Sequence, residues 1–472
     1  MRRRMGLTLL ACAVSLGKAE AQEILSQPER ATPTPSAPVA EDKQNLDDLI
    51  RLGLDVNPKL AQVNFAIDNA RGRALQVGLY PNPTVDILGN EVGDRTGPGG
   101  IWTTPLVGQE IVTRGKLKLN RAAAQREVDQ TTYQLMYARY TMFASIRGSY
   151  FEILALQKRM DILDYLVNIA DRSVDQTRKL LDARQVARLD LVQLEIEAEK
   201  LRADREATER EFDPAYRSLA ASIGLNRIER TRLAGDLETP LPEYDLDRTQ
   251  AYLLEVHPEV QSAQVGVEKA RILLRRAQVE PYPNFTLLAG YTRQNQNLSN
   301  DYDLGVSLPI PVWNRNQGNI QSARANIGES TQQIGKVQNE LTAQLGLAFR
   351  DFASSRRLAE RYKTAILPRA KEAFDLSMKA YQGGQFEYLR VLTAERALAQ
   401  ANLEYVKALR DAWNAASVIS GLALEDEWPP KPVAAANPLF YILESNGLLK
   451  LRLQLSITHR GNRFLPSTRR AC

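Results

Sequence analysis

The sequence has few of the residues that build metal centres, disulfides and many active sites. Of 472 residues only two are cysteines, Cys12 and Cys472, and only two are histidines, His257 and His459. Two cysteines at opposite ends of the chain exclude a disulfide framework and a thiolate zinc site. The sequence also lacks a Walker-type phosphate loop, a His-Glu-x-x-His pair and a Cys-x-x-Cys pair. We therefore expect no catalytic residue, no metal site and no cofactor.

The remaining candidate groups have simpler structural explanations. His257 comes directly before Pro258, which is typical of a residue at the start of a helix rather than of a general base. Glu195, Glu197 and Glu199 fall on a long helix that also carries basic residues, a pattern typical of a solvated helix face.

The chain after residue 22 has no apolar run approaching the roughly 18 residues of a membrane-spanning helix. The one long apolar run of the whole sequence, residues 5–17, follows Arg2-Arg3-Arg4 and precedes Ala19-Glu20-Ala21. This order predicts a signal peptide over residues 1–21, cleaved between Ala21 and Gln22. An alternative is that Leu9-Leu10-Ala11-Cys12 is a lipobox that leaves a lipidated Cys12. Residues 22–43 are rich in proline and form a linker.

The positive charge of the chain lies at its ends. Residues 1–21 carry +3 and residues 431–472 carry +6, so the total of +5 leaves −4 for residues 22–430. A basic total often indicates nucleic-acid binding, but here the part that folds is mildly acidic. We therefore expect no nucleic-acid partner. Residues 426–472 form a C-terminal tail that we expect to be disordered.

The body of the chain repeats itself with a period near 200 residues, which predicts a duplication. The matching pairs are Val56-Asn57-Pro58 with Val256-His257-Pro258, Pro81 with Pro281, Leu189 with Leu389, Glu195 with Glu395, and Gly224-Leu225 with Gly421-Leu422. The predicted repeats are residues 44–235 and 236–425. Each is expected to contain a helix, a β-hairpin, a very long helix and a return helix.

The hairpins are expected at residues 84–112 and 285–310, where apolar and polar residues alternate as in a membrane strand. The long helices are expected at about 116–182 and 318–381, the second kinked at Pro368. Such long coiled-coil helices need neighbours along their whole length. Four strands per chain cannot close a barrel, so chains must pool strands: two would give eight and three would give twelve.

A signal peptide followed by two such units resembles the TolC-like outer-membrane efflux channels over residues 44–425. Within this family, the loop Leu308-Pro309-Ile310-Pro311-Val312-Trp313-Asn314-Arg315-Asn316-Gln317-Gly318 is most similar to the CzcC-like branch of heavy-metal cation exporters. The resemblance implies a mainly α fold with a small β part, in a homotrimer with a twelve-stranded outer-membrane barrel above a periplasmic α-helical barrel.

The resemblance also implies the partners and the function. The chain would be the outer-membrane channel of a tripartite efflux system in a Gram-negative cell, in contact with outer-membrane lipid. It would receive substrate from an inner-membrane pump of the resistance–nodulation–division type through a periplasmic adaptor. Heavy-metal cations are the expected substrate, and multidrug or small-molecule export is the alternative. A secreted periplasmic coiled-coil scaffold is an alternative of another class, although it does not explain the paired hairpins.

In the family, the tips of the helical hairpins close the periplasmic entrance and meet the adaptor. The corresponding residues are Arg184, Gln185, Val186, Ala187, Gly383, Gly384, Gln385 and Phe386. Gly383-Gly384 suits a tight turn because glycine tolerates a positive φ.

The resemblance also assigns an aperture to Asp190, Arg390 and Thr393. The family has carboxylates just after the second tip, where this chain has Arg390 and Thr393, so an acidic ring is not implied. Asp190 and Arg390 are equivalent in the two repeats, and we predict that they form an ion pair across the tips. The alternative is that both are solvated.

Overall fold

The computed structural model describes residues 44–429, apart from residues 91, 93–99, 185, 296, 297 and 384–387. The predicted signal peptide with its cleavage site Ala21–Gln22, the possible lipidation site Cys12 and the linker lie outside the described residues. Most of the predicted tail, including Cys472, lies outside them as well.

The first half of the described chain runs from α1 to α4. Its elements are α1 (Leu46–Val56), α2 (Pro58–Gln76), β1 (Thr84–Asn90), β2 (Ile101–Ile111), α3 (Lys116–Asp182) and α4 (Arg188–Ile223). The second half runs from α5 to α9. Its elements are α5 (Leu246–Val256), α6 (Pro258–Val279), β3 (Phe285–Gln294), β4 (Asn300–Ser307), α7 (Gln317–Arg361), the π-helix η1 (Tyr362–Ile366), α8 (Leu367–Gln382) and α9 (Tyr388–Leu422).

The order of elements is the same in the two halves, and the expected hairpins and long helices form close to their predicted positions. That the halves descend from one duplicated unit stays a prediction, as do the domain boundaries. The short helices α1 and α5 are not among the elements that the sequence predicts. Each precedes the turn at Asn57 or His257, where a capping side chain and a proline at the first helical position start α2 or α6.

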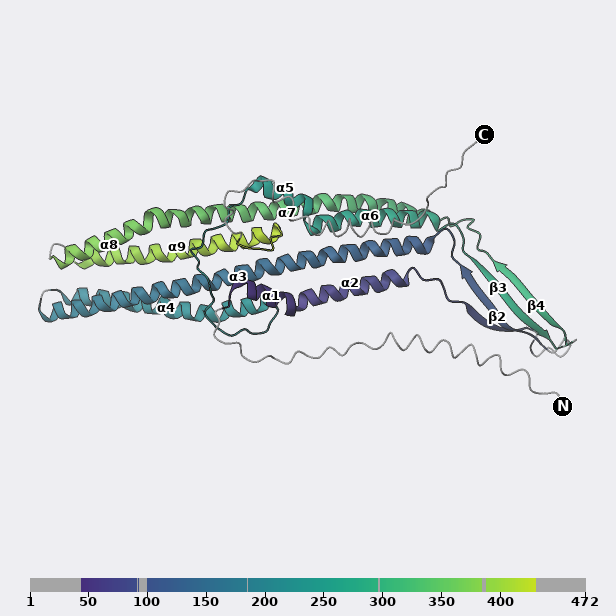
Figure 1. Cartoon of the computed structure of the whole chain (residues 1–472), viewed down its shortest axis with the longest axis horizontal. Coiled ribbons are helices and arrows are strands. Elements are labelled where there is room, and N and C mark those ends of the chain that lie inside the picture. The colour runs from purple at the N-terminus through teal and green to yellow at the C-terminus, as the bar shows by residue number, and fades with distance from the viewer. Residues whose placement is uncertain are drawn as a thin grey trace, which may run out of the picture. The chain divides into compact units, whose positions relative to one another are not determined.

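The long helices pack side by side, with α4 and α2 along α3, and with α9 along both α3 and α7 (Figure 1). Their core is one large apolar cluster centred on Phe143, Phe151 and Trp413, all buried. On α3, Phe143, Tyr150 and Leu154 are buried, but Met136 is exposed. The apolar residues of α3 are therefore only partly covered in the single chain.

The second long helix differs from the first by an interruption. The sequence predicts a kink at Pro368, and the structure has a π-helix, η1, that ends two residues before this proline. Because proline has no backbone N–H and clashes with the preceding turn, the hydrogen-bond ladder must change here. Among the helices in the described ranges, none is both long enough and apolar enough to cross a membrane.

The four strands form one antiparallel sheet in the order β1-β2-β3-β4. The central pair, β2 and β3, joins the two halves. The register places Val85, Val107, Ala289 and Leu304 in a single row across all four strands. All four of these side chains are exposed, Leu304 by 86%. One face of the sheet is therefore apolar and uncovered in the single chain, and β1 and β4 are its open edges.

Candidate functional site: the hairpin tips and the strand–helix junction

The first hairpin tip, between α3 and α4, turns on an arginine. Arg184 has a φ of 54°, the left-handed conformation that few residues other than glycine adopt. Val186 and Ala187 follow, and α4 begins at Arg188. The Asp190 carboxylate accepts a hydrogen bond from the Ala187 N–H at 3.1 Å, so it caps the N-terminus of α4.

The second tip corrects one expectation. Gly383 has a φ of −80°, so it does not use the positive φ for which glycine was expected there. The tip residues Gly384, Gln385 and Phe386, and Gln185 in the first tip, lie outside the described residues. Arg390 and Thr393 are exposed on α9. The ion pair between Asp190 and Arg390 stays a prediction.

Behind the tips, a second apolar cluster holds the two hairpins together. It contains Leu166 and Val174 of α3, Leu194 of α4, and Val391 and Leu392 of α9. Because these residues come from three helices, the position of α9 near the tip depends on apolar packing against the first hairpin.

An ion pair crosses the same contact. Arg396 of α9 donates to the Glu197 carboxylate of α4 at 2.6 Å, and Lys200 lies 3.6 Å from the same carboxylate. Only 14% of the Glu197 side chain is exposed. The expectation of a solvated face is therefore wrong for Glu197, because α9 covers it, whereas Glu199 remains exposed.

Glu395 is buried beside this ion pair. It is 3% exposed, and neither carboxylate oxygen has a hydrogen-bond partner. Burial, together with the negative charge of Glu197, raises the pKa of Glu395 to about 7, although Arg396 opposes the shift. The sequence identifies Glu395 as a repeat match of Glu195 but not as a buried residue. The difference that marks it is at another position: Glu195 pairs with Arg178, and the residue 200 positions after Arg178 is Met378.

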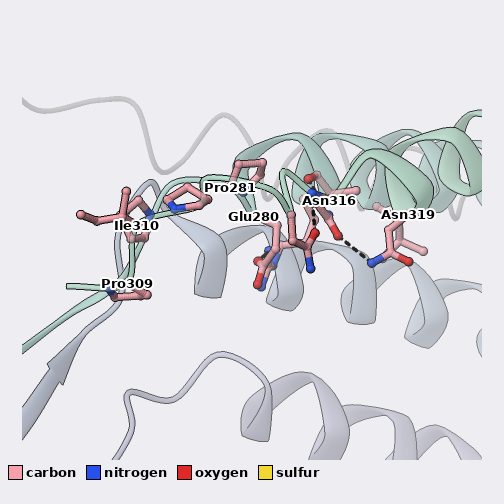
Figure 2. A pocket seen from close by; sticks show the side chains of 12 residues that line it. Glu280, Pro281, Pro309, Ile310, Asn316 and Asn319 are labelled. Carbon is pink, nitrogen blue, oxygen red and sulfur yellow. Dashed lines mark hydrogen bonds and ion pairs between the residues drawn. The ribbon is translucent and has the colours of Figure 1, made fainter. Parts of the chain in front are cut away.

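The other notable region is the junction between the sheet and the helices. A pocket of about 610 Å³ lies where β4 leads into α7 and α6 leads towards β3, and Figure 2 shows the side chains that line it. The labelled residues include Pro281, Pro309 and Ile310 on its apolar side, and Asn316, which accepts a hydrogen bond from Asn319. The chain turns directly before α7, where Asn316 adopts a φ of 62°. Trp313 in this turn is 88% exposed.

Hydrogen bonds connect the two halves at this junction. The Lys116 ammonium is buried and donates to the Tyr282 carbonyl at 2.6 Å and to the Asn284 side chain at 3.1 Å. The Asn284 amide donates in turn to Glu110 at 2.7 Å. This network fixes the start of α3 against the strand entry of the second half.

Neither region has the geometry of an active site. Within the described ranges, no group of three or more His, Cys, Asp or Glu side chains is placed to hold a metal ion. His257 is buried, its Nδ1 accepts from the Glu259 N–H at 3.3 Å, and burial lowers its pKa to about 4. The predicted capping role of His257 is confirmed.

Comparison with solved structures identifies the fold. The outer membrane protein VceC from Vibrio cholerae matches with a TM-score of 0.67 and 19% sequence identity, over 80% of this chain and 96% of that one. The fold, mostly helical with one small sheet, is that of the TolC-like outer-membrane channels.

The chain belongs to the outer membrane efflux protein family, whose model matches residues 49–225 and 251–420. It is therefore an outer-membrane protein with a large helical part in the periplasm, and it is not an enzyme, as the sequence predicts.

Two curated relatives span most of this family domain. The cobalt-zinc-cadmium resistance protein CzcC of Cupriavidus metallidurans is 25% identical over 376 residues, which cover 79% of this chain and 88% of that protein. The pyoverdine export outer membrane protein OpmQ of Pseudomonas aeruginosa is 24% identical over 348 residues, which cover 68% of this chain and 69% of that protein.

Proposed function

We propose that this chain is the outer-membrane channel of a tripartite efflux system that exports heavy-metal cations. The observation that supports this substrate class is the similarity to CzcC, a cobalt-zinc-cadmium resistance protein, across 88% of that protein. Residues 308–318, which follow β4 and include the first two residues of α7, also support it through their resemblance to the CzcC-like branch. The channel passes the ions without binding them at a fixed site, and the pump supplies the energy.

The assembly that we propose is a homotrimer. The exposed apolar row Val85, Val107, Ala289 and Leu304 is suited to lipid, because apolar surface of this extent is costly in water. The open edges of β1 and β4 must be paired in a membrane, since each unpaired backbone group there costs several kcal/mol. Three sheets joined edge to edge give twelve strands, enough for a conducting lumen.

The same assembly explains the uneven burial of α7. Within the described part of this helix, the buried residues are Leu341, Leu345, Ala348, Phe349, Phe352 and Ala359. Its first 24 residues, Gln317–Glu340, contribute none. A helix needs packing along its length to be stable, so we propose that a second protomer covers this part.

The hairpin tips are the proposed contact with the periplasmic adaptor, which connects the channel to a pump of the resistance–nodulation–division type. The described tip residues Arg184, Val186, Ala187 and Gly383 are at least partly exposed, as an adaptor contact requires. We place the aperture at Asp190, Arg390 and Thr393, next to these tips. The proposed adaptor contact also includes the tip residues outside the described ranges, Gln185, Gly384, Gln385 and Phe386.

A second candidate is the export of organic molecules. It is supported by the similarity to OpmQ, a pyoverdine export protein, over 69% of that protein. Cations and organic molecules can use the same kind of tunnel, so the fold does not separate these substrates. Family membership argues against the periplasmic scaffold, because outer membrane efflux proteins are channels.

Deletion of the gene, followed by growth on graded concentrations of Co²⁺, Zn²⁺ and Cd²⁺ and on hydrophobic drugs, tests the substrate class. We expect the deletion strain to be sensitised to the metal ions more than to the drugs, and the wild-type gene to restore resistance. Equal sensitisation, or greater sensitivity to the drugs, would favour organic export instead.

A further inference from the structure

The contact between the two helical hairpins contains a carboxylate that is placed to respond to pH. Glu395 lies on α9 between Val391 and Ala399, which both belong to the apolar cluster behind the tips. Its side chain is almost completely buried, and both of its oxygens lack a hydrogen-bond partner. A buried carboxylate without partners is stable only when it is protonated, because an unpaired buried charge is very costly.

Of the charged groups around Glu395, only Arg396 favours its ionised form, and its effect is smaller than those of burial and of Glu197. On α4, Glu197 is negative and opposes ionisation. On α9, Arg396 is engaged by Glu197 at 2.6 Å. On α8 the cluster includes Tyr381, which stays neutral because burial raises its pKa. On α3, Arg178 is paired with Glu195 at 3.1 Å.

We propose that Glu395 is a proton-controlled switch in the contact between α4 and α9. In the protonated state, Glu395 stays in the apolar cluster, and Arg396 remains bound to Glu197 across the contact. When Glu395 loses its proton to water, it becomes a second carboxylate that competes for Arg396 and moves towards solvent. The ion pair between α4 and α9 then weakens, and the hairpins separate near the tips.

The repeat provides an internal reference for this proposal. Glu195 is the counterpart of Glu395 in the first half, and its partner Arg178 keeps it at the surface in an ion pair. The second half has Met378 in place of that arginine, and Met378 packs against the apolar cluster. With Met378 at this position, the second half has no counterpart of Arg178 that could hold an ionised Glu395 in place.

The pH range of the switch follows from the pKa of Glu395, which lies at about 7. The ionised fraction then rises from roughly one tenth near pH 6 to roughly nine tenths near pH 8. The proposal rests on the proposed function, because loosening of the hairpins near the tips matters for transport only in a channel whose entrance lies there.

Pulsed electron paramagnetic resonance on the full-length assembled protein tests the switch. Nitroxide labels are placed at A203C on α4 and Q400C on α9, two exposed positions, in a C472S background, with labelled chains diluted among unlabelled ones. We expect a single short distance at pH 6, and a longer population that grows with a midpoint near pH 7. An unchanged distance distribution between pH 6 and pH 8 would overturn the proposal.

The matched variants are Glu395→Gln and Glu195→Gln. Glu395→Gln has nearly the same shape but cannot ionise, so we expect the short distance at both pH values. Glu195→Gln, the control in the first half, should keep the wild-type response. A pH response that persists in Glu395→Gln would contradict the proposal.

A third variant, Glu197→Gln, decides the question even if Glu395→Gln fails to assemble. Glu197→Gln removes the ion pair to Arg396 across the contact, so we expect the longer population at pH 6 as well as at pH 8; a single short distance at pH 6 would overturn the proposal. Because the labels report a distance rather than transport, this result and the growth result on the deletion strain can fail independently.

Discussion

The two halves of the chain contain the same elements in the same order, but equivalent positions are used differently. In the first half, the turn before α2 has Asn57, whose amide donates to the Ile223 carbonyl at 3.0 Å. In the second half, the equivalent turn has His257, which is buried and makes a T-shaped ring contact with Tyr137. The fold accepts either residue because both accept a hydrogen bond from the N-terminus of the following helix.

The same contrast recurs along the helices. An exposed ion pair, Arg178–Glu195, corresponds to a buried carboxylate, Glu395, beside Met378. The comparison teaches that the common fold fixes where helices start and stop, while equivalent positions differ in their burial and in their partners. Three matched substitutions test this conclusion, beginning with the one expected to have the largest effect.

Trp413 is the second-half residue whose loss should cost the most. It is fully buried, it stacks on Phe151 at a centroid distance of 4.1 Å, and its Nε1 donates to the Leu237 carbonyl at 2.9 Å. We expect Trp413→Ala to lower the free energy of unfolding by about 3–5 kcal/mol, the usual cost of removing a buried aromatic side chain. Denaturant unfolding in detergent measures this loss.

The first-half counterpart provides the control for Trp413. Tyr216, 197 positions earlier, is also buried and donates to the Thr231 carbonyl. We expect Tyr216→Phe to cost only about 1 kcal/mol, because it removes one hydrogen bond and leaves the packing intact. Equal losses of unfolding free energy for the two variants would show that the packing of the Trp413 ring contributes little to stability beyond its hydrogen bond.

His257→Asn should change how stability depends on acid. Burial lowers the pKa of His257 from 6.5 to about 4, so between these values the unfolded chain binds a proton that the folded chain does not. Stability is therefore lost as the pH falls from about 6.5 towards 4, by roughly 2 kcal/mol at pH 5. Asparagine does not titrate, and Asn57 shows that it can cap the equivalent helix.

Unfolding of the wild type and of His257→Asn at pH 7.5 and pH 5 measures this difference. We expect the variant to lose less stability on acidification. The control is Asn57→Ala, which should lower stability by a similar amount at both pH values because no titrating group is involved. Parallel pH profiles for the wild type and His257→Asn would show that His257 does not contribute to acid sensitivity.

The smallest effect is expected for Arg178→Met, which places in the first half the residue type that the second half has at the equivalent position, Met378. The Arg178 and Glu195 side chains are 55% and 43% exposed, and exposed ion pairs contribute only about 0–1 kcal/mol. We expect the free energy of unfolding to change by less than about 1 kcal/mol, with Glu195 staying at the surface. A loss well above this value would mean that the pair is structural and that the halves differ more than their fold suggests.

The elements of the fold could be predicted from the sequence because their signals are local. Asn57-Pro58 and His257-Pro258 mark helix starts, and the alternation of Tyr302, Leu304 and Val306 marks a strand. The interruption at Pro368 was predicted as a kink, but its form as a π-helix depends on how the hydrogen-bond ladder adjusts, which no local pattern specifies. The left-handed residue of the first tip, Arg184, could not be predicted for the same reason.

The sequence by itself determined the order of the main elements, although not α1, α5 or η1, and the approximate ends of the long helices, since periodicity, proline and capping residues act over a few positions. Only the tertiary structure decided that Glu197 and Glu395 lie in the contact between α4 and α9 and that Lys116 is buried at the junction. Burial depends on which helices meet, and the residues that meet here are separated by as much as 199 positions. Local sequence predicts that a charged residue on a helix is solvated, because it does not identify the distant helix that covers the residue in the folded chain.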